Sequence, residues 1–129
     1  TFSSRGLGDV YKRQDLNKHS FISFGRGAPS PVYNPDWALK LGTKDNKKRK
    51  TVMKVNSVYG LLLAVQSGVG LAALPDYITV NQPNIVKVLP NIEGPITEAH
   101  FVYPQSMKNV ARVQAFRNFL YSKISEWEF

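Results

Sequence analysis

The chain has 129 residues, of which 43% are hydrophobic and 12% aromatic, a composition typical of one folded domain and not of a disordered chain. It contains no cysteine, which excludes disulfides and thiolate chemistry and fits a reducing compartment. The formal net charge of +8 raises the question of nucleic-acid binding, while no apolar run approaches the roughly eighteen residues of a membrane span.

The first fourteen residues show neither a helical nor a strand period and do not lead into the pattern that follows. They resemble translated adapter sequence at the end of an assembled read, so we expect residues 1–14 to be non-native and exclude them from the fold. They also lack the apolar stretch and cleavage site of a signal peptide. We therefore expect the genuine domain to begin near Asp15, within a longer gene.

Strand patterns alternate with helical patterns in the rest of the chain, which favours an α/β fold with a parallel or mixed sheet. In chain order we expect a strand at residues 21–24, a loop at 25–35, a brief helix at 36–41 and a charged connection at 44–50. We then expect a strand at 51–55, a helix from 58 to a stop at 68, a strand at 70–74 and a helical turn at 76–80. The chain should end with strands at 85–89 and 96–103 and a long helix at 109–127. The strand at 21–24 places Phe21 and Ser23 on one face and Ile22 and Phe24 on the other.

The final helix carries an apolar stripe that needs a sheet to pack against. The earlier helices are expected to cover the strands of this chain already, which indicates a missing neighbouring domain. The stripe consists of Val113, Phe116, Leu120, Ile124 and Trp127.

The centre of the chain predicts one complete strand, helix, strand unit. Residues 51–55 are rich in β-branched side chains, and either Asn56 or Ser57 supplies an oxygen that caps the following helix. Gly68 is expected to end this helix in a left-handed conformation. Residues 70–74 then form a short apolar run, closed by Pro75, that suits a buried parallel strand.

Ligands in such sheets bind beyond the carboxyl ends of the strands, where a helix N-terminus offers unpaired N–H groups and a positive dipole end. Asn56 and Ser57 occupy this place, so the pattern predicts a ligand-binding corner. The alternative is that these side chains only cap the helix, as most Asn and Ser at such junctions do.

The positive charge is local. Residues 1–14 hold three cationic side chains and one acidic, and residues 44–50 hold five and one, so the two segments carry +2 and +4 of the net charge. The run at 44–50 has no interleaved aromatic residue and lies in a connection, which favours a solvated loop over phosphate binding.

Other motifs give no support to catalysis or cofactor binding. Residues 68–73 match G-x-G-x-x-A, but they follow a helix and open a strand, which is the reverse of a dinucleotide site, so we expect a helix stop and a close backbone approach. Glu98 and His100 lack a third metal ligand and are expected to form a solvated pair. We expect no metal, no cofactor and no enzymatic activity.

Several short sequence motifs follow one another in a characteristic order along the chain. They are Asp-Leu-Asn-Lys-His-Ser-Phe-Ile-Ser-Phe from residue 15, Val-Asn-Ser from 55, Ala-Val-Gln-Ser-Gly-Val-Gly-Leu-Ala-Ala-Leu-Pro from 64, Ile-Val-Lys-Val-Leu-Pro from 85, Val-Tyr-Pro from 102 and Arg-Val-Gln-Ala-Phe-Arg-Asn-Phe-Leu from 112. Together they resemble the effector-binding domain of LysR-type transcriptional regulators over residues 15–127.

The resemblance implies a type 2 periplasmic-binding-protein-like fold, in which two α/β subdomains hold a small-molecule effector in the cleft between them. Residues 15–95 would form the second subdomain, and the crossover strand and C-terminal helix at 96–129 would return to the first, whose remainder is absent. The resemblance also implies a cytoplasmic bacterial protein that forms a homo-oligomer, a dimer or tetramer, and binds DNA only through a missing N-terminal helix-turn-helix.

The resemblance further implies an effector site. Asn56, Ser57 and Val58 would face the effector, Phe24, Phe101 and Tyr103 would also line the cleft, and a carboxylate would suit the helix N-terminus. One alternative is a fragment of an extracytoplasmic solute-binding protein of the same fold, which an upstream signal peptide would indicate. Another is an enzyme on this fold, which a positioned base or nucleophile would indicate.

Overall fold

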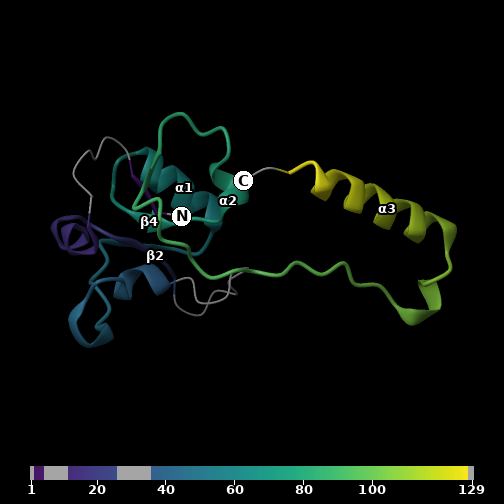
Figure 1. Cartoon of the computed structure of the whole chain (residues 1–129), viewed down its shortest axis with the longest axis horizontal. Helices are drawn as coiled ribbons and strands as arrows, with labels where there is room; N and C mark the ends of the chain where they lie inside the picture. Colours follow the sequence, from purple (N-terminus) through teal and green to yellow (C-terminus); the bar gives the residue numbers. More distant parts are fainter. Residues whose placement is uncertain (1, 5–11, 26–35, 128–129) are drawn as a thin grey trace. The chain divides into compact units, whose positions relative to one another are not determined.

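The computed structural model describes residues 2–4, 12–25 and 36–127, and it divides into two compact units, Thr1–Thr97 and Glu98–Phe129 (Figure 1). The boundary expected from the sequence, between residues 95 and 96, lies close to this division. Most of the loop expected at 25–35 lies outside the described residues. Within the described residues, no helix combines the length and hydropathy needed to cross a membrane.

Parallel pairing organises the sheet of the first unit. Strand β2 (Ile22–Phe24) pairs in parallel with β3 (Met53–Val55), with Ile22 opposite Met53 and Phe24 opposite Val55. On its other edge, Phe21 forms a parallel bridge to Leu71, and the Ile22 N–H donates to the Leu71 carbonyl over 2.8 Å. The strands expected at 21–24 and 51–55 are therefore confirmed as a parallel pair, although the ladder is shorter than the sequence runs. Of the strand expected at 70–74, Leu71 contributes one parallel bridge, and Ala72–Ala73 forms a short strand.

The described residues form a second sheet of three strands, and its pairing is antiparallel. Strand β1 (Phe2–Ser4) lies between β4 (Ala72–Ala73) and β5 (Val86–Val88) and is antiparallel to both. The sequence predicted no regular element within residues 1–14, and this differs from the structure. Three residues are too few to show a period, so the hydrogen bonds to the neighbouring strands, and not any local pattern, define β1.

Two hydrophobic clusters lie on the two faces of β2. On one face, Ile22 and Phe24 pack with residues of α1 (Val58–Gln66), and half-buried Ile78 of α2 (Asp76–Thr79) packs against them. On the other face, Phe21 and Leu71 pack with residues of the 3-10 helices η1 (Arg13–Lys18) and η2 (Trp37–Lys40). The described part of the first unit therefore combines strands with helices on both faces of β2, which confirms the α/β class and the two-faced burial of residues 21–24.

The glycines at residues 68 and 70 have the two roles predicted for them. Gly68 follows α1 with φ of 78°, a left-handed conformation that ends the helix. A Cβ on Gly70 would lie 2.5 Å from the Ser20 carbonyl oxygen, so the bridge between Phe21 and Leu71 requires a residue without a side chain here.

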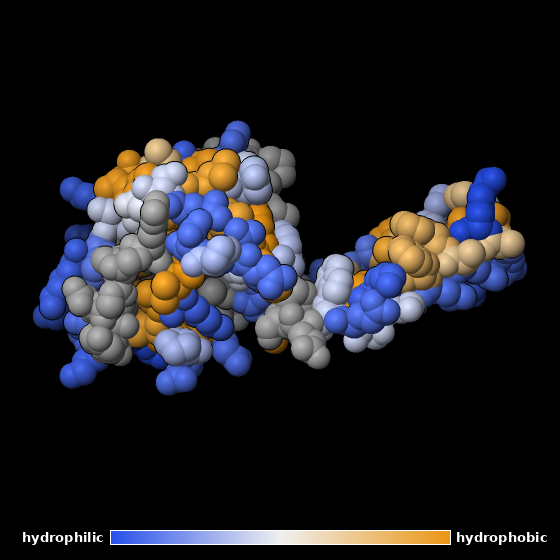
Figure 2. All heavy atoms as spheres, turned by 90° about the horizontal axis from the view of Figure 1, so that it is seen from above, coloured by the Kyte–Doolittle hydropathy of each residue, from blue (hydrophilic) through white to orange (hydrophobic). Residues whose placement is uncertain are grey.

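The second unit consists of η4 (Gln105–Met107), α3 (Ala111–Ser125) and the extended segment before them. The prediction of a long C-terminal helix is confirmed, but no residue of α3 is buried, and Phe116 and Ile124 of its apolar stripe are about half exposed. Figure 2 shows hydrophobic residues gathered on the surface of this helix.

The strand predicted at residues 96–103 is wrong. The residues are extended, but none of them forms a ladder with another described segment, and Ile96 and Val102 are 89% and 83% exposed. A strand requires a partner for its N–H and C=O groups, so β propensity alone does not produce one. The turn at 44–50 also contains a short 3-10 helix, η3 (Lys44–Asn46), which the sequence did not predict.

Candidate functional site

The ends of the two parallel strands β2 and β3 lie side by side at the predicted corner. After Phe24, the Gly25 N–H continues the ladder and donates to the Val55 carbonyl oxygen over 2.7 Å. A Cβ on Gly25 would lie 3.7 Å from the Asn56 Cβ, so the chain leaves β2 directly beside Asn56. The corner is therefore formed by two strand ends and the start of α1.

Ser57 is the residue that caps α1. Its backbone is extended, its Oγ accepts a hydrogen bond from the Gly60 N–H over 3.3 Å, and its carbonyl oxygen accepts from the Leu61 N–H over 3.0 Å. The sequence left the cap open between Asn56 and Ser57, and the structure decides for Ser57. The Asn56 side chain is exposed and has no hydrogen bond with any described residue.

The first two N–H groups of α1, those of Val58 and Tyr59, have no acceptor within the helix because an α-helix leaves its first N–H groups unpaired. Ser57 uses its two oxygens on Gly60 and Leu61 instead. Together with the positive end of the helix dipole, these two N–H groups can bind an anionic group.

Gly60 allows the helix to begin so close to β3. A Cβ at this position would lie 2.6 Å from the Val55 Cγ1 and 3.6 Å from the Ser57 Cβ. Sequence reasoning did not single out Gly60. A glycine in the first turn of an otherwise apolar helix was the signal that could have identified it, because glycine there lowers helix propensity and needs a packing reason.

The apolar residues predicted for the site are mainly part of the core. Phe24 is 8% exposed and packs with Leu61, Leu62 and other residues between β2 and α1. Val58 is half-buried and packs against the same cluster. These contacts hold the corner in place, and the predicted contact of either side chain with an effector stays a prediction.

Phe101 and Tyr103 belong to the second unit, where their rings lie 5.4 Å apart. Phe101 also packs edge to face on Phe116 of α3, with 5.6 Å between the ring centroids. The Arg117 Nη1 donates to the Tyr103 hydroxyl oxygen over 3.4 Å. The structure therefore brings Phe24, Asn56, Ser57 and Val58 together in one unit and places the remaining two predicted residues in the other.

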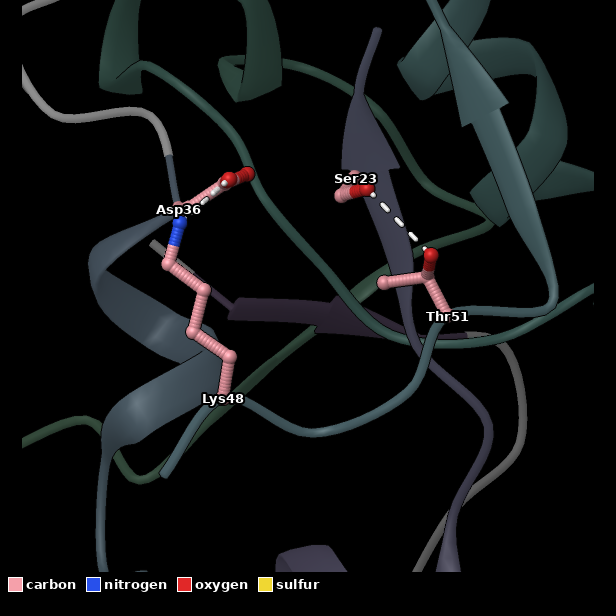
Figure 3. A network of polar contacts seen from close by, with 4 residues as sticks. All are labelled: Ser23, Asp36, Lys48 and Thr51. Atoms are coloured by element: carbon pink, nitrogen blue, oxygen red, sulfur yellow. Dashed lines mark hydrogen bonds and ion pairs between the residues drawn. The ribbon is translucent and has the colours of Figure 1, made fainter. Parts of the chain in front are cut away.

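Polar contacts fix the segment that leads into β3 (Figure 3). The Ser23 hydroxyl on β2 donates to the Thr51 hydroxyl over 3.4 Å, which gives this buried side chain a partner. Lys48 reaches the Asp36 carboxylate at the start of η2, with 3.2 Å between Nζ and Oδ2. The first contact joins the segment before β3 to β2, and the second joins it to the start of η2.

Arg49 is anchored by several contacts within the described part of the unit. Its Nε donates to the Asn17 Oδ1 over 2.9 Å, its Nη1 donates to the Leu41 carbonyl over 2.6 Å, and its guanidinium lies 5.3 Å from the centre of the Phe21 ring. Burial lowers the pKa of the Arg49 guanidinium, which nevertheless stays charged at physiological pH.

The described residues contain no group of three or more His, Cys, Asp or Glu side chains that could hold a metal ion. The Glu98 Oε2 lies 3.6 Å from the His100 Nε2, and both side chains are largely exposed, which confirms the prediction of a solvated pair.

Comparison with known families identifies the domain. The family model of the LysR substrate binding domain matches residues 5–124, nearly the whole chain. The chain belongs to the LysR substrate binding domain family. No curated protein and no solved structure matches it significantly. The match begins inside the segment that we expect to be non-native.

The LysR substrate binding domain is the effector-binding part of LysR-type transcriptional regulators, and it has a periplasmic-binding-protein-like fold. The α/β architecture of the first unit agrees with this family. Members of the family belong to regulatory proteins.

Proposed function

We propose that this chain senses a small-molecule effector at the corner formed by the ends of β2 and β3 and the start of α1. One observation carries the proposal: Ser57 caps the helix alone, which leaves the Asn56 amide exposed beside the unpaired N–H groups of Val58 and Tyr59. The helix cap needs only Ser57, so capping does not account for the polar side chain of Asn56. Membership of an effector-binding family supports the same role.

The proposed ligand is a small anion, and a carboxylate fits best. Two backbone N–H groups at a helix N-terminus match the two oxygens of a carboxylate, and the helix dipole adds about 0.3–1 kcal/mol for a negative charge at an exposed position. The Asn56 side chain would add one further donor. Asn56 would then bind through its side chain, and Val58 and Tyr59 through their N–H groups. Ser57 caps the helix beside them, and Phe24 packs in the core next to α1.

In the complete protein, we propose that residues 15–95 form the second subdomain, that residues 96–129 return to the first, and that Phe101 and Tyr103 also line the effector cleft. Effector binding would change the closure of the subdomains and so the arrangement of a dimer or tetramer on DNA. The DNA-binding helix-turn-helix would lie in another part of the polypeptide, and the protein would act in the cytoplasm. No cofactor or catalytic step is assigned to the domain.

The test is a titration of this chain with a panel of small carboxylates, each matched to its uncharged amide, followed by NMR of the backbone amides. We expect the N–H signals of Val58 and Tyr59 to shift with the carboxylates and not with the amides. The matched variants are Asn56→Ala, which should weaken the shifts without loss of stability, and Gln66→Ala at the far end of α1, which should leave them unchanged.

In a full-length regulator, the same carboxylate should change the affinity for DNA, and Asn56→Ala should reduce this response. Shifts confined to residues outside the corner, or a DNA affinity that no panel member changes, would refute the proposed site. An upstream signal peptide in place of a helix-turn-helix would assign the chain to the solute-binding alternative.

A further inference from the structure

Cationic side chains from separate parts of the first unit gather on one surface. The described segments 15–20 and 36–50 hold seven Lys and Arg residues against three Asp residues. Their net charge of +4 is half of the chain's net charge of +8, in a small part of its length. We define the basic surface as Lys18, Lys40, Lys44, Lys47, Lys48 and Lys50, all of which are exposed. Figure 2 shows hydrophilic residues along the left edge of this unit, the side on which the segments of η1 and η3 lie in Figure 1.

Arg49 holds these segments together. Its N–H donates to the Leu39 carbonyl over 2.9 Å and its Nη1 to the Leu41 carbonyl, both at η2, while its Nε donates to Asn17 of η1. Because Arg49 points inward onto the Phe21 ring, its chain neighbours Lys48 and Lys50 remain at the surface. The run at 44–50 is therefore a fixed part of the unit and not a free loop.

Most of the charge on this surface is uncompensated. The acidic residues Asp15 and Asp36 lie within 3.7 Å and 3.2 Å of Lys18 and Lys48, respectively. Lys40, Lys44, Lys47 and Lys50 form no ion pair with any described residue. Lys44 and Lys47 also lie at the two ends of one tight turn, in which the Lys47 N–H donates to the Lys44 carbonyl over 3.2 Å. This turn also contains Asp45, which is exposed and forms no ion pair with a described residue, so the turn keeps a net positive charge. An extended polyanion is attracted to such uncompensated positive charge.

We infer that this basic surface binds the phosphate backbone of duplex nucleic acid, without reading its sequence. Exposed lysines are flexible point charges that suit phosphates, and the basic surface includes no exposed aromatic side chain among the described residues, so it lacks the stacking platform of a single-strand binder. The structure thus alters the sequence-based preference for a solvated loop. The inference does not depend on the effector role of the Asn56 corner, because none of the six lysines belongs to that corner.

The size of the effect follows from counterion release. If the four unpaired lysines each contact one phosphate, the logarithm of the binding constant should fall with the logarithm of salt concentration with a slope of about −3.6. Between about 50 and 200 mM salt this is a loss of roughly 100-fold in affinity.

The experiment measures binding of the whole chain to a short labelled DNA duplex of random sequence by fluorescence anisotropy at several salt concentrations. The test variant combines Lys44→Gln, Lys47→Gln and Lys50→Gln, and we expect its slope to be shallower by about 2.7. The matched control combines Lys87→Gln, Lys108→Gln and Lys123→Gln, which removes the same charge elsewhere and should keep the original slope.

Equal losses in the two triple variants would overturn the inference, because net charge alone would then explain the binding. Absence of binding at low salt would overturn it as well. Competition by poly-glutamate that equals competition by unlabelled duplex would assign the surface to an acidic protein instead. Circular dichroism verifies that each variant is folded; if the test variant is not, Lys47→Gln alone should make the slope shallower by about 0.9.

Discussion

Replacing Gly60 by alanine should have opposite effects on stability in two backgrounds. A helix gains about 0.5–1 kcal/mol when alanine replaces glycine, but the new Cβ would lie 2.6 Å from the Val55 Cγ1. Val55 is β-branched and cannot easily rotate away, so the overpacking should cost about 1–3 kcal/mol. The net result for Gly60→Ala is a loss of about 1 kcal/mol, taken from the middle of both ranges. In a Val55→Ala background the obstacle is gone, and Gly60→Ala should stabilise by about 0.5–1 kcal/mol.

Urea unfolding measures this sign reversal. Trp127 lies in the second unit, so a Trp127→Phe background leaves Trp37 as the only tryptophan and makes the fluorescence report on the first unit. The slope of the unfolding free energy against urea should be the same in all variants. Gly68→Ala serves as the control, because Gly68 has no atom within 4 Å of its Cβ position and its cost comes only from the positive φ. The same sign for Gly60→Ala in both backgrounds would refute the proposed contact.

Three further changes test other contacts. Ser57→Ala should cost about 0.5–1 kcal/mol, at the lower end for a cap because its hydrogen bond is 3.3 Å long, while Asn56→Ala should stay within about 0.5 kcal/mol; equal losses in thermal unfolding would contradict the assignment of the cap. Gly70→Ala should cost about 1–3 kcal/mol and reduce hydrogen-exchange protection of the Leu71 N–H; retained protection would argue against the close approach to the Ser20 carbonyl. Arg49→Lys should lose about 1–3 kcal/mol, nearly as much as Arg49→Met, because lysine cannot reproduce the two side-chain hydrogen bonds; full stability of the lysine variant would show that charge alone suffices.

The central unit was predictable because its signals are local. The alternation of residues 21–24 between two faces, the helical spacing of Leu61, Leu62 and Val65, and the stop at Gly68 each follow from the period of one element, and the structure confirms them. The choice of Ser57 over Asn56 as the cap was not predictable, because both residue types cap helices and only the backbone conformation decides between them.

Features that depend on distant partners could not be read from the sequence. Residues 96–103 have strand propensity, but no described segment pairs with them, whereas Phe2–Ser4 has little local signal and is bonded on both sides. The non-native origin of residues 1–14 stays a prediction. The basic surface also required the structure, since the contacts of Arg49 join Asn17 and Leu41, which the sequence separates widely.

The position of β2 also affects the entropy cost of ligand binding at the corner. This strand is hydrogen-bonded on one edge to β3 and on the other at Leu71, and all of Phe21, Ile22, Ser23 and Phe24 are buried. Its amide protons should therefore be among the slowest to exchange in the unit. A ligand that arrives beside Asn56 would meet a wall that is already ordered before binding. The entropy lost on association would then come from the ligand and from mobile groups around it, and little of it from the strand that forms the wall.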